Sequence, residues 1–299
     1  MNRILVIRGG AIGDFILTLP TLKALRDRFP AAHIEILGYQ HIAVLAEQRF
    51  YAQAVRSIEY AAISGFFAKD SVLSSELREY FAGFDLIISY LYDPDQIFET
   101  NLRRAGARKI LIGLAKIDNH SHAARQLAEP ITKYGIDVAD FTAKIFPSTE
   151  DRQFAREFLA GLNEPTLALH PGSGSEQKNW PLQNWIELGD NLPGSLIIVA
   201  GEADTERATA WQDRHVRFAK NLPLPQLAAV LTNTIFVGHD SGISHLAAAV
   251  GAKCILLFGP TDPNVWAPLN ENVRVIRAPN GDLRKLDVDL VREALRIVA

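Results

Sequence analysis

The sequence has little of the chemistry that holds disulfide-rich or metal-rich proteins together. Its 299 residues include one cysteine and one methionine. The single Cys254 excludes an internal disulfide framework and a multi-cysteine metal site. It stands in the apolar run 254–258, which favours a buried small hydrophobic side chain over a reactive nucleophile.

Long hydrophobic runs and a strong charge of either sign are also missing. No apolar run approaches the ~20 residues of a membrane span, and the apolar stretch within residues 1–7 is too short for a signal-peptide core. The net charge of −3 gives no general reason to expect a nucleic-acid or membrane partner. We therefore expect a cytoplasmic protein that does not bind nucleic acid.

What the sequence does contain is a regular alternation of apolar runs of strand length with amphipathic stretches of helix length. This alternation predicts the α/β class, with parallel sheets covered on both faces. The predicted strands are 3–8, 33–37, 85–90 and 109–114, then 166–170, 195–200, 235–238 and 254–258. The predicted helices are 12–29, 77–81 and 151–162, then 184–191, 225–231, 244–250 and 283–298.

The chain is longer than one hydrophobic core usually organises, so two domains are expected. The strand signal lapses near residues 150–164 and a second series then begins. This pattern predicts two doubly wound domains that face a cleft, joined near residue 160. Residues 60–77 are polar, aromatic and poorly periodic, and we expect a mobile loop there.

The first predicted strand runs into a glycine-rich turn at residues 8–14. The dinucleotide fingerprint needs glycine where Arg8 stands, and no Lys-Ser/Thr pair follows to make a P-loop. The turn instead offers Asp14, at the start of a helix and at the edge where open α/β sheets place ligands. Asp14 is either a helix cap or a general base for an incoming hydroxyl.

Two segments after strands of the second half have residues suited to a nucleotide. Ser173, Gly174 and Ser175 let backbone amides approach a phosphate, and Lys178 adds a positive charge. A plain polar turn is the competing interpretation. Glu202 follows the strand 195–200, where a carboxylate can accept hydrogen bonds from ribose hydroxyls, or can cap a helix.

A third segment joins the strand 235–238 to a helix of small residues. Ser241 and Gly242 expose backbone amides at the mouth of this helix, where the helix dipole favours a pyrophosphate. A carboxylate such as Asp240 would be unfavourable in a site that binds only phosphate. Its presence therefore suggests that the site also binds the hydroxyls of a sugar. His245 either donates to a phosphate or is a structural histidine.

Taken together, these segments resemble the family 9 glycosyltransferases, the heptosyltransferase-like enzymes of bacterial lipopolysaccharide assembly. The resemblance covers nearly the whole chain and rests on the order and spacing of its motifs, since each motif alone is weak. The matching segments are 7–14, 19–20, 29–30, 170–173, 178, 180–181, 201–202, 237–242, 245–249 and 258–263.

The resemblance implies a GT-B fold, with two Rossmann-like domains around a central cleft. Residues 1–160 would bind the acceptor, residues 161–282 the nucleotide-sugar, and the helix in 283–299 would pack back on the first domain. It further implies an inverting transfer of a heptose or related sugar from an ADP-sugar to a glycan or glycolipid, in lipopolysaccharide or other cell-surface polysaccharide synthesis. No cofactor or obligatory metal is expected, and membrane contact is at most peripheral, at the inner-membrane face.

The resemblance also assigns roles to individual residues. Asp14 would be the general base, and Lys178 would neutralise the donor phosphates or the departing diphosphate. Glu202 would hold the ribose, and Asp240 the sugar hydroxyls. The remaining donor contacts that it implies are Gly13, Ser173, Gly174, Ser175, Ser241, Gly242 and His245.

Some features depart from the family pattern. Family members that act on the phosphorylated inner core carry a basic acceptor loop, but residues 63–70 hold one lysine, Lys69, offset by Asp70. A less charged acceptor glycan is therefore expected. His120 and His122 match a family segment but receive no role, and His239 is interpreted as incidental.

Two other functions remain open from the sequence. A GT-B-like sugar-nucleotide epimerase would need acid and base groups around the donor sugar and would act on the free nucleotide-sugar without an acceptor. A non-catalytic nucleotide-sugar-binding protein would lack turnover, against which the joint presence of Asp14, Lys178 and Asp240 argues.

Overall fold

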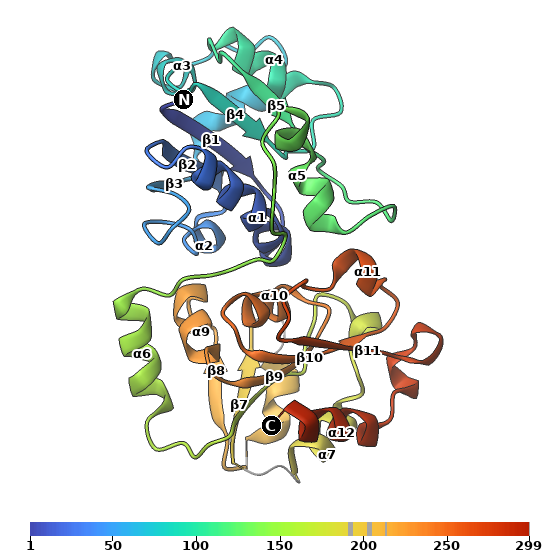
Figure 1. The fold of residues 1–299 in the computed structure, drawn as a ribbon. Coiled ribbons are helices and arrows are strands. Elements are labelled where there is room, and N and C mark those ends of the chain that lie inside the picture. Colours follow the sequence, from blue (N-terminus) through green and yellow to red (C-terminus); the bar gives the residue numbers. More distant parts are fainter. Residues whose placement is uncertain (191–193, 202–204, 213, 299) are drawn as a thin grey trace. The chain divides into compact units, whose positions relative to one another are not determined.

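The computed structural model describes residues 1–190, 194–201, 205–212 and 214–298. The chain divides into two compact units, Met1–Phe141 and Thr142–Ala299, and each contains one parallel sheet with helices against it (Figure 1). The two predicted series of strands and helices thus correspond to two separate α/β units.

The sheet of the first unit has the strand order β3-β2-β1-β4-β5, and its pairings are parallel. The order reverses between β1 and β4, which makes this pair the topological switch point where open α/β sheets bind ligands. The strands are β1 Arg3–Arg8, β2 His33–Gly38, β3 Ala54–Ser57, β4 Leu86–Ser89 and β5 Ile110–Ile112.

Helices cover both faces of this sheet. Helices α1 and α5 pack together (Figure 1), while the 3₁₀ helix η1 and helices α3 and α4 pack against the face that carries Leu5, Ile7 and Ile87. The helices are α1 Ile12–Arg28, α2 Gln40–Ala43, η1 Ala61–Phe67, α3 Ser75–Ala82, α4 Ile97–Arg104 and α5 Ala123–Lys133. Burial on both faces explains why the central strands are continuous apolar runs.

The expectation of a mobile loop at residues 60–77 is wrong for its first half. Residues Ala61–Phe67 form η1, and Ile63 and Phe66 are buried in the core. The ring of Phe66 lies 4.6 Å from that of Phe81, measured between centroids. A 3₁₀ turn has a period of three residues and is short, so its two buried side chains leave no helical periodicity to detect.

The sheet of the second unit has the order β11-β10-β9-β6-β7-β8, again with parallel pairings. Its switch point lies between β9 and β6, where strands that follow in sequence extend to opposite sides. The strands are β6 Thr166–His170, β7 Ser195–Ala200, β8 Arg217–Lys220, β9 Ile235–His239, β10 Lys253–Phe258 and β11 Val273–Arg277.

Helices α7 and α12 share one core with the sheet, built around Trp180, Trp185 and Trp211. Helices α9 and α10 contact each other, and α6 packs on α9. The helices are α6 Thr149–Leu159, α7 Leu182–Asp190, α8 Thr205–Ala208, α9 Leu224–Leu231, α10 Gly242–Ala249, α11 Pro263–Trp266 and α12 Val288–Val298. The 3₁₀ helices are η2 Glu176–Lys178, η4 Thr209–Trp211, η5 Pro279–Gly281 and η6 Leu283–Lys285.

The boundary between the units differs from the expected one at residue 160. Helix α6 packs on α9 and belongs to the second unit, because Arg217 of β8 donates to the carbonyl oxygens of Phe158 and Ala160 at its end. The last helix contributes Val291 and Leu295 to the core of the second unit, and its packing on the first domain stays a prediction. The acceptor and donor roles of the two domains stay predictions.

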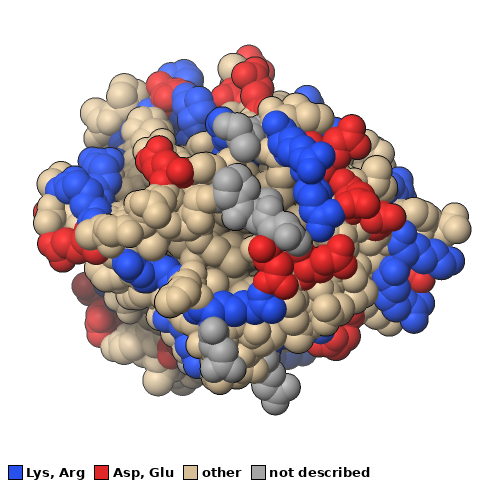
Figure 2. All heavy atoms as spheres, turned by 90° about the horizontal axis from the view of Figure 1, so that it is seen from below, with Lys and Arg blue, Asp and Glu red and all other residues tan. Residues whose placement is uncertain are grey.

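Three expectations from composition can be compared with the structure. Cys254 is fully buried, as predicted, and burial raises the pKa of its thiol. None of the helices formed by described residues has the length and apolar character needed to cross a membrane. On the face seen from below in Figure 2, basic and acidic side chains lie interspersed.

Candidate functional site

The switch point of the second unit brings together two of the predicted site residues. Lys178 lies in the loop after β6, and Asp240 follows β9, the strand that pairs with β6. The Lys178 Nζ atom is 2.7 Å from Oδ2 of Asp240, a charge-assisted hydrogen bond. The Asp240 side chain is 10% exposed and that of Lys178 31%. The sequence predicted both residues but not their contact.

Helix α10 begins directly after this ion pair. Ser241 is its N-cap residue, and its hydroxyl accepts the Ser244 amide N–H at 3.3 Å. The first turn of α10 has no acidic residue, so the positive end of the helix dipole is not neutralised from within. Ser241 Oγ also lies 3.4 Å from Nδ1 of His170 at the end of β6. The arrangement suits a phosphate group next to the α10 N-terminus.

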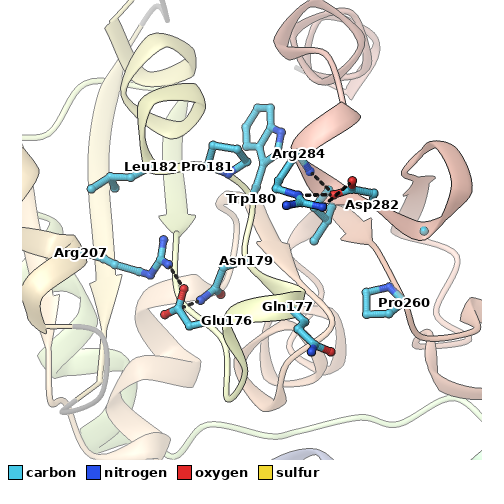
Figure 3. Close-up of a pocket in the computed structure, with 12 residues that line it drawn as sticks. Glu176, Gln177, Asn179, Trp180, Pro181, Leu182, Arg207, Pro260, Asp282 and Arg284 are labelled. Atoms are coloured by element: carbon cyan, nitrogen blue, oxygen red, sulfur yellow. Dashed lines mark hydrogen bonds and ion pairs between the residues drawn. The ribbon is translucent and has the colours of Figure 1, made fainter.

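Side chains of the loop from 173 to 179 contact one another and Arg207 of α8. The Ser173 hydroxyl lies 2.8 Å from Oδ1 of Asn179. Asn179 donates to the Glu176 carboxylate at 3.3 Å, and Arg207 pairs with the same carboxylate at 2.6 Å. Figure 3 shows Glu176 between these two partners. These contacts join the middle of the loop to Asn179 at its end and to Arg207 of α8.

The same loop forms one wall of a cavity of about 1130 Å³. Glu176, Gln177 and Asn179 line this wall, and Asp282 and Arg284 line another (Figure 3). The cavity lining that the structure describes includes none of the predicted site residues. The cavity therefore adjoins the predicted donor site without coinciding with it.

The structure places the other predicted donor residues unevenly. Gly174 and Ser175 are exposed, and Gly242 is half-buried at the first position of α10. His245 is buried, and its amide donates to the carbonyl oxygen of Ser241. Glu202 lies outside the described residues.

His239 was interpreted as incidental, yet the structure buries it completely at the end of β9. Its Nε2 accepts the backbone N–H of Trp180 at 2.8 Å, and its Nδ1 lies 3.4 Å from the carbonyl oxygen of Gly172. The ring stands edge-on to Trp185, with centroids 5.1 Å apart. The imidazole thus joins β9 to both ends of the loop after β6.

In the first unit, Asp14 lies at the switch point between β1 and β4. The carboxylate accepts the backbone N–H of Ala11 at 2.9 Å, so Asp14 caps α1, and its role as general base stays a prediction. Ala11, the N-cap residue, has no side-chain acceptor for the amide of Asp14, so only one of the two hydrogen bonds of a capping box is present. The other carboxylate oxygen is 3.4 Å from the Arg8 guanidinium, and 35% of the Asp14 side chain remains exposed.

Arg8 is a second residue whose importance the sequence did not reveal. It ends β1 and is only 5% exposed, and burial lowers the pKa of its guanidinium, partly offset by the charge of Asp14. Its guanidinium lies over the Tyr90 ring, 5.6 Å from the centroid. An arginine that ends an otherwise apolar buried strand is the signal that marks such a residue, because a buried cation needs a partner.

Gly10 is required by the geometry around Asp14. Its φ of +97° lies in the left-handed region, and a Cβ atom there would stand 2.8 Å from Oδ2 of Asp14. Gly13 occupies the first turn of α1, immediately before Asp14. Gly10 therefore leaves room for the Asp14 carboxylate, and the donor contact expected of Gly13 stays a prediction.

His120 and His122, which match a family segment but received no role, have structural partners. The Nδ1 atom of His122 accepts the Ala124 N–H and caps α5. His120 is exposed and pairs with Asp118. Across the described part of the chain, no group of three or more His, Cys, Asp or Glu side chains is arranged to hold a metal ion. The metal-independent reaction stays a prediction.

Comparison with protein families matches residues 114–291, more than half of the chain, to the model described as glycosyltransferase family 9 (heptosyltransferase). Lipopolysaccharide heptosyltransferase 1 of Escherichia coli K12 is 32% identical over 161 residues, which cover 50% of this chain and 50% of that protein. Lipopolysaccharide heptosyltransferase 3 of E. coli is 25% identical over 310 residues, with 92% and 88% covered. The first of these matches thus spans about half the length of the relative.

Solved structures agree with the fold. A family 9 glycosyl transferase from Veillonella parvula superposes with a TM-score of 0.82 at 19% identity, covering 99% of this chain and 97% of the other. The E. coli ADP-heptose lipopolysaccharide heptosyltransferase II gives a TM-score of 0.78 at 17% identity, with 100% and 98% covered. The GT-B fold class predicted from the sequence is confirmed.

Proposed function

Since the chain belongs to glycosyltransferase family 9, we propose that it transfers a heptose or related sugar from an ADP-sugar to a glycan or glycolipid acceptor. The reaction would serve lipopolysaccharide or other cell-surface polysaccharide synthesis. The observation that carries this proposal is the Lys178–Asp240 pair beside the N-terminus of α10, at the switch point of the second unit.

The diphosphate of the donor suits the N-terminus of α10. This terminus is capped by the neutral hydroxyl of Ser241 and has no acid in its first turn, so it attracts an anion. Lys178 supplies a full positive charge nearby, and its ammonium group has three donors, of which Asp240 uses one. The remaining donors are available to phosphate oxygens.

Asp240 is the acidic member of this site and suits the sugar. A carboxylate accepts hydrogen bonds through four lone-pair positions, and Lys178 occupies one of them. Vicinal sugar hydroxyls supply donors for the others. Because Lys178 balances the charge of Asp240, the carboxylate can lie next to a diphosphate with less repulsion than an unpaired acid.

Asp14 is proposed as the general base. Its carboxylate binds Arg8 and the Ala11 amide through different oxygens and stays partly exposed, so lone pairs remain for an acceptor hydroxyl. As the acceptor oxygen bonds to the anomeric carbon, its proton passes to Asp14. The bond from that carbon to the diphosphate breaks, and the diphosphate leaves with the electron pair, inverting the configuration.

Lys178 and the α10 amides would act on the leaving group. Negative charge grows on the diphosphate as its bond to the sugar breaks, and fixed positive groups stabilise this charge most in the transition state. No cofactor and no metal ion are proposed, and the free donors of Lys178 and the α10 dipole would act on the diphosphate instead. Contact with the inner membrane face remains part of the proposal for a glycolipid acceptor.

The test is a calorimetric panel on the full chain, with ADP, UDP, GDP and their sugar conjugates as ligands. We expect ADP and ADP-heptose to raise the melting temperature, because a ligand that binds only the folded state stabilises it. Stabilisation by uridine nucleotides alone would overturn the ADP-sugar assignment.

Turnover is then measured as release of ADP with and without a glycan acceptor, in the presence of a chelator. If ADP release depends on the acceptor and persists with the chelator, the protein is a transferase that works without a metal ion. Inversion of the free nucleotide-sugar without an acceptor would instead identify an epimerase, and binding without any turnover would identify a non-catalytic binding protein.

A further inference from the structure

His239 is a buried titratable side chain that the mechanism above does not use. It ends β9, one residue before Asp240, and none of its surface is exposed. Its ring contacts both ends of the loop that carries Lys178, and Lys178 in turn contacts Asp240. We propose that His239 is a positioning residue, which sets the place of Lys178 relative to Asp240.

The hydrogen bonds of His239 define its tautomer. An imidazole nitrogen that accepts an N–H carries no proton, and Nε2 accepts the Trp180 amide at 2.8 Å. A neutral ring then has its proton on Nδ1, which faces the carbonyl oxygen of Gly172 at 3.4 Å. His239 is therefore neutral, with Nδ1 as the donor. Protonation of Nε2 would set a donor against the Trp180 donor.

The two partners of the His239 ring lie at the two ends of the loop that carries Ser173 and Lys178. Gly172 precedes Ser173, and Trp180 comes two residues after Lys178. With its two ends joined to one ring, the loop cannot shift along β9 without breaking a buried hydrogen bond, which is costly because the freed polar group has no water partner.

The backbone of His239 extends the same connection to α10. Its carbonyl oxygen accepts the hydroxyl of Ser244 in the first turn of the helix. One residue thus contacts the loop of Lys178, precedes Asp240 and holds the start of α10. These are the three parts that the proposed function assigns to the donor, so the positioning role rests on that function.

The test is a double-mutant cycle with ADP as the probe, measured by titration calorimetry on the full chain. His239→Phe keeps an aromatic ring against Trp185 but removes both ring hydrogen bonds. We expect it to weaken ADP binding about 10-fold, the size of one lost buried hydrogen bond. In a Lys178→Ala background the same substitution should weaken binding less than about 2-fold, because the two residues act together.

His239→Gln is the conservative variant. Its side-chain oxygen can replace Nε2 as the acceptor for the Trp180 amide, so it should recover more than half of the loss in binding free energy. Val291→Ala is the matched control, a buried truncation in the same core on α12. It should lower the melting temperature while leaving ADP affinity unchanged.

Hydrogen exchange of the amides in residues 173–179 gives a readout that needs no ligand. His239→Phe should speed their exchange at least about 10-fold, the opening expected when a buried hydrogen bond is lost, whereas Val291→Ala should not. Unchanged exchange, or equal losses of ADP affinity with and without Lys178, would overturn the positioning role. A wild-type chain that binds no ADP but shows the exchange difference would overturn the proposed function and leave the positioning role supported.

Discussion

The two switch points differ in where their carboxylate lies. In the first unit Asp14 is part of helix α1, and in the second unit Asp240 is part of the turn that precedes helix α10. Asp14 lies in the first turn of α1 and accepts a helix-terminal N–H, while the cation Arg8 is buried at the end of the strand. Asp240 precedes α10, and its cation, Lys178, comes from the neighbouring loop. Ser241 alone caps α10 from the turn.

This difference decides which switch point suits an anion. In the first unit the positive end of the helix dipole is already neutralised by Asp14, so a phosphate there would meet an acid. In the second unit a neutral hydroxyl caps the helix, and the nearby acid is paired with a lysine. The same plan of strand, small residues and helix thus gives a capping carboxylate in one unit and, in the other, a helix terminus with a neutral cap, which is the proposed diphosphate site.

The largest effect is expected from Asp14→Asn, which removes the base but keeps an oxygen for the Ala11 amide. Transfer should fall about 10²–10⁴-fold, the usual contribution of a general base. ADP affinity should stay close to that of the wild type, while the melting temperature should fall, because the buried Arg8 loses its anionic partner. The measurements are initial rates of ADP release with acceptor, and calorimetry of ADP binding.

The control for this substitution is Asp27→Asn on the same helix, where the carboxylate pairs with Lys23 at the surface. It should leave turnover unchanged. Full turnover in Asp14→Asn would return Asp14 to the role of helix cap alone, and the contrast between the two switch points would lose its catalytic half.

A smaller effect is expected from Ser241→Asp, which gives α10 the kind of acid that α1 already has. Aspartate is as good an N-cap as serine and favours the helix dipole, so stability should not decrease. ADP affinity should fall at least about 10-fold, because a second negative charge would lie beside the diphosphate.

Ser241→Asn is the matched control for that charge. Asparagine has nearly the same size as aspartate and caps equally well. It should reduce ADP affinity by less than about 3-fold, which is less than half of the ~1.4 kcal/mol that corresponds to a tenfold change in affinity. Equal affinities for the Asp and Asn variants would show that the α10 terminus does not receive the diphosphate.

The sequence predicted the central strands well because of how they are buried. β1, β6 and β7 have the bounds expected from their apolar runs, since parallel strands covered on both faces are continuously hydrophobic. Strands β3, β8 and β11 lie at sheet edges and were missed. Residues such as Arg217 and Arg274 interrupt their apolar pattern, because one side of an edge strand contacts solvent.

The site was predictable as residue types but not as contacts. Asp240 and Lys178 were each named from their chemistry, while their hydrogen bond joins positions 62 residues apart. His239 was dismissed because a histidine in a sequence shows neither its burial nor its tautomer. Arg8 was noted only as a departure from a glycine motif, and its pairing with Asp14 depends on the turn at Gly10.

The smallest effect is expected from Ser241→Ala, which separates the hydroxyl from the helix terminus that it caps. Loss of the bond from the Ser244 amide should destabilise the second unit by about 1 kcal/mol, measured by chemical denaturation. The α10 amides and Lys178 remain, so ADP affinity should change less than about 3-fold. A loss of ADP binding as large as that of Ser241→Asp would mean that the hydroxyl itself binds the diphosphate. The difference between the two switch points would then come from the Ser241 side chain itself and not from the dipole of α10.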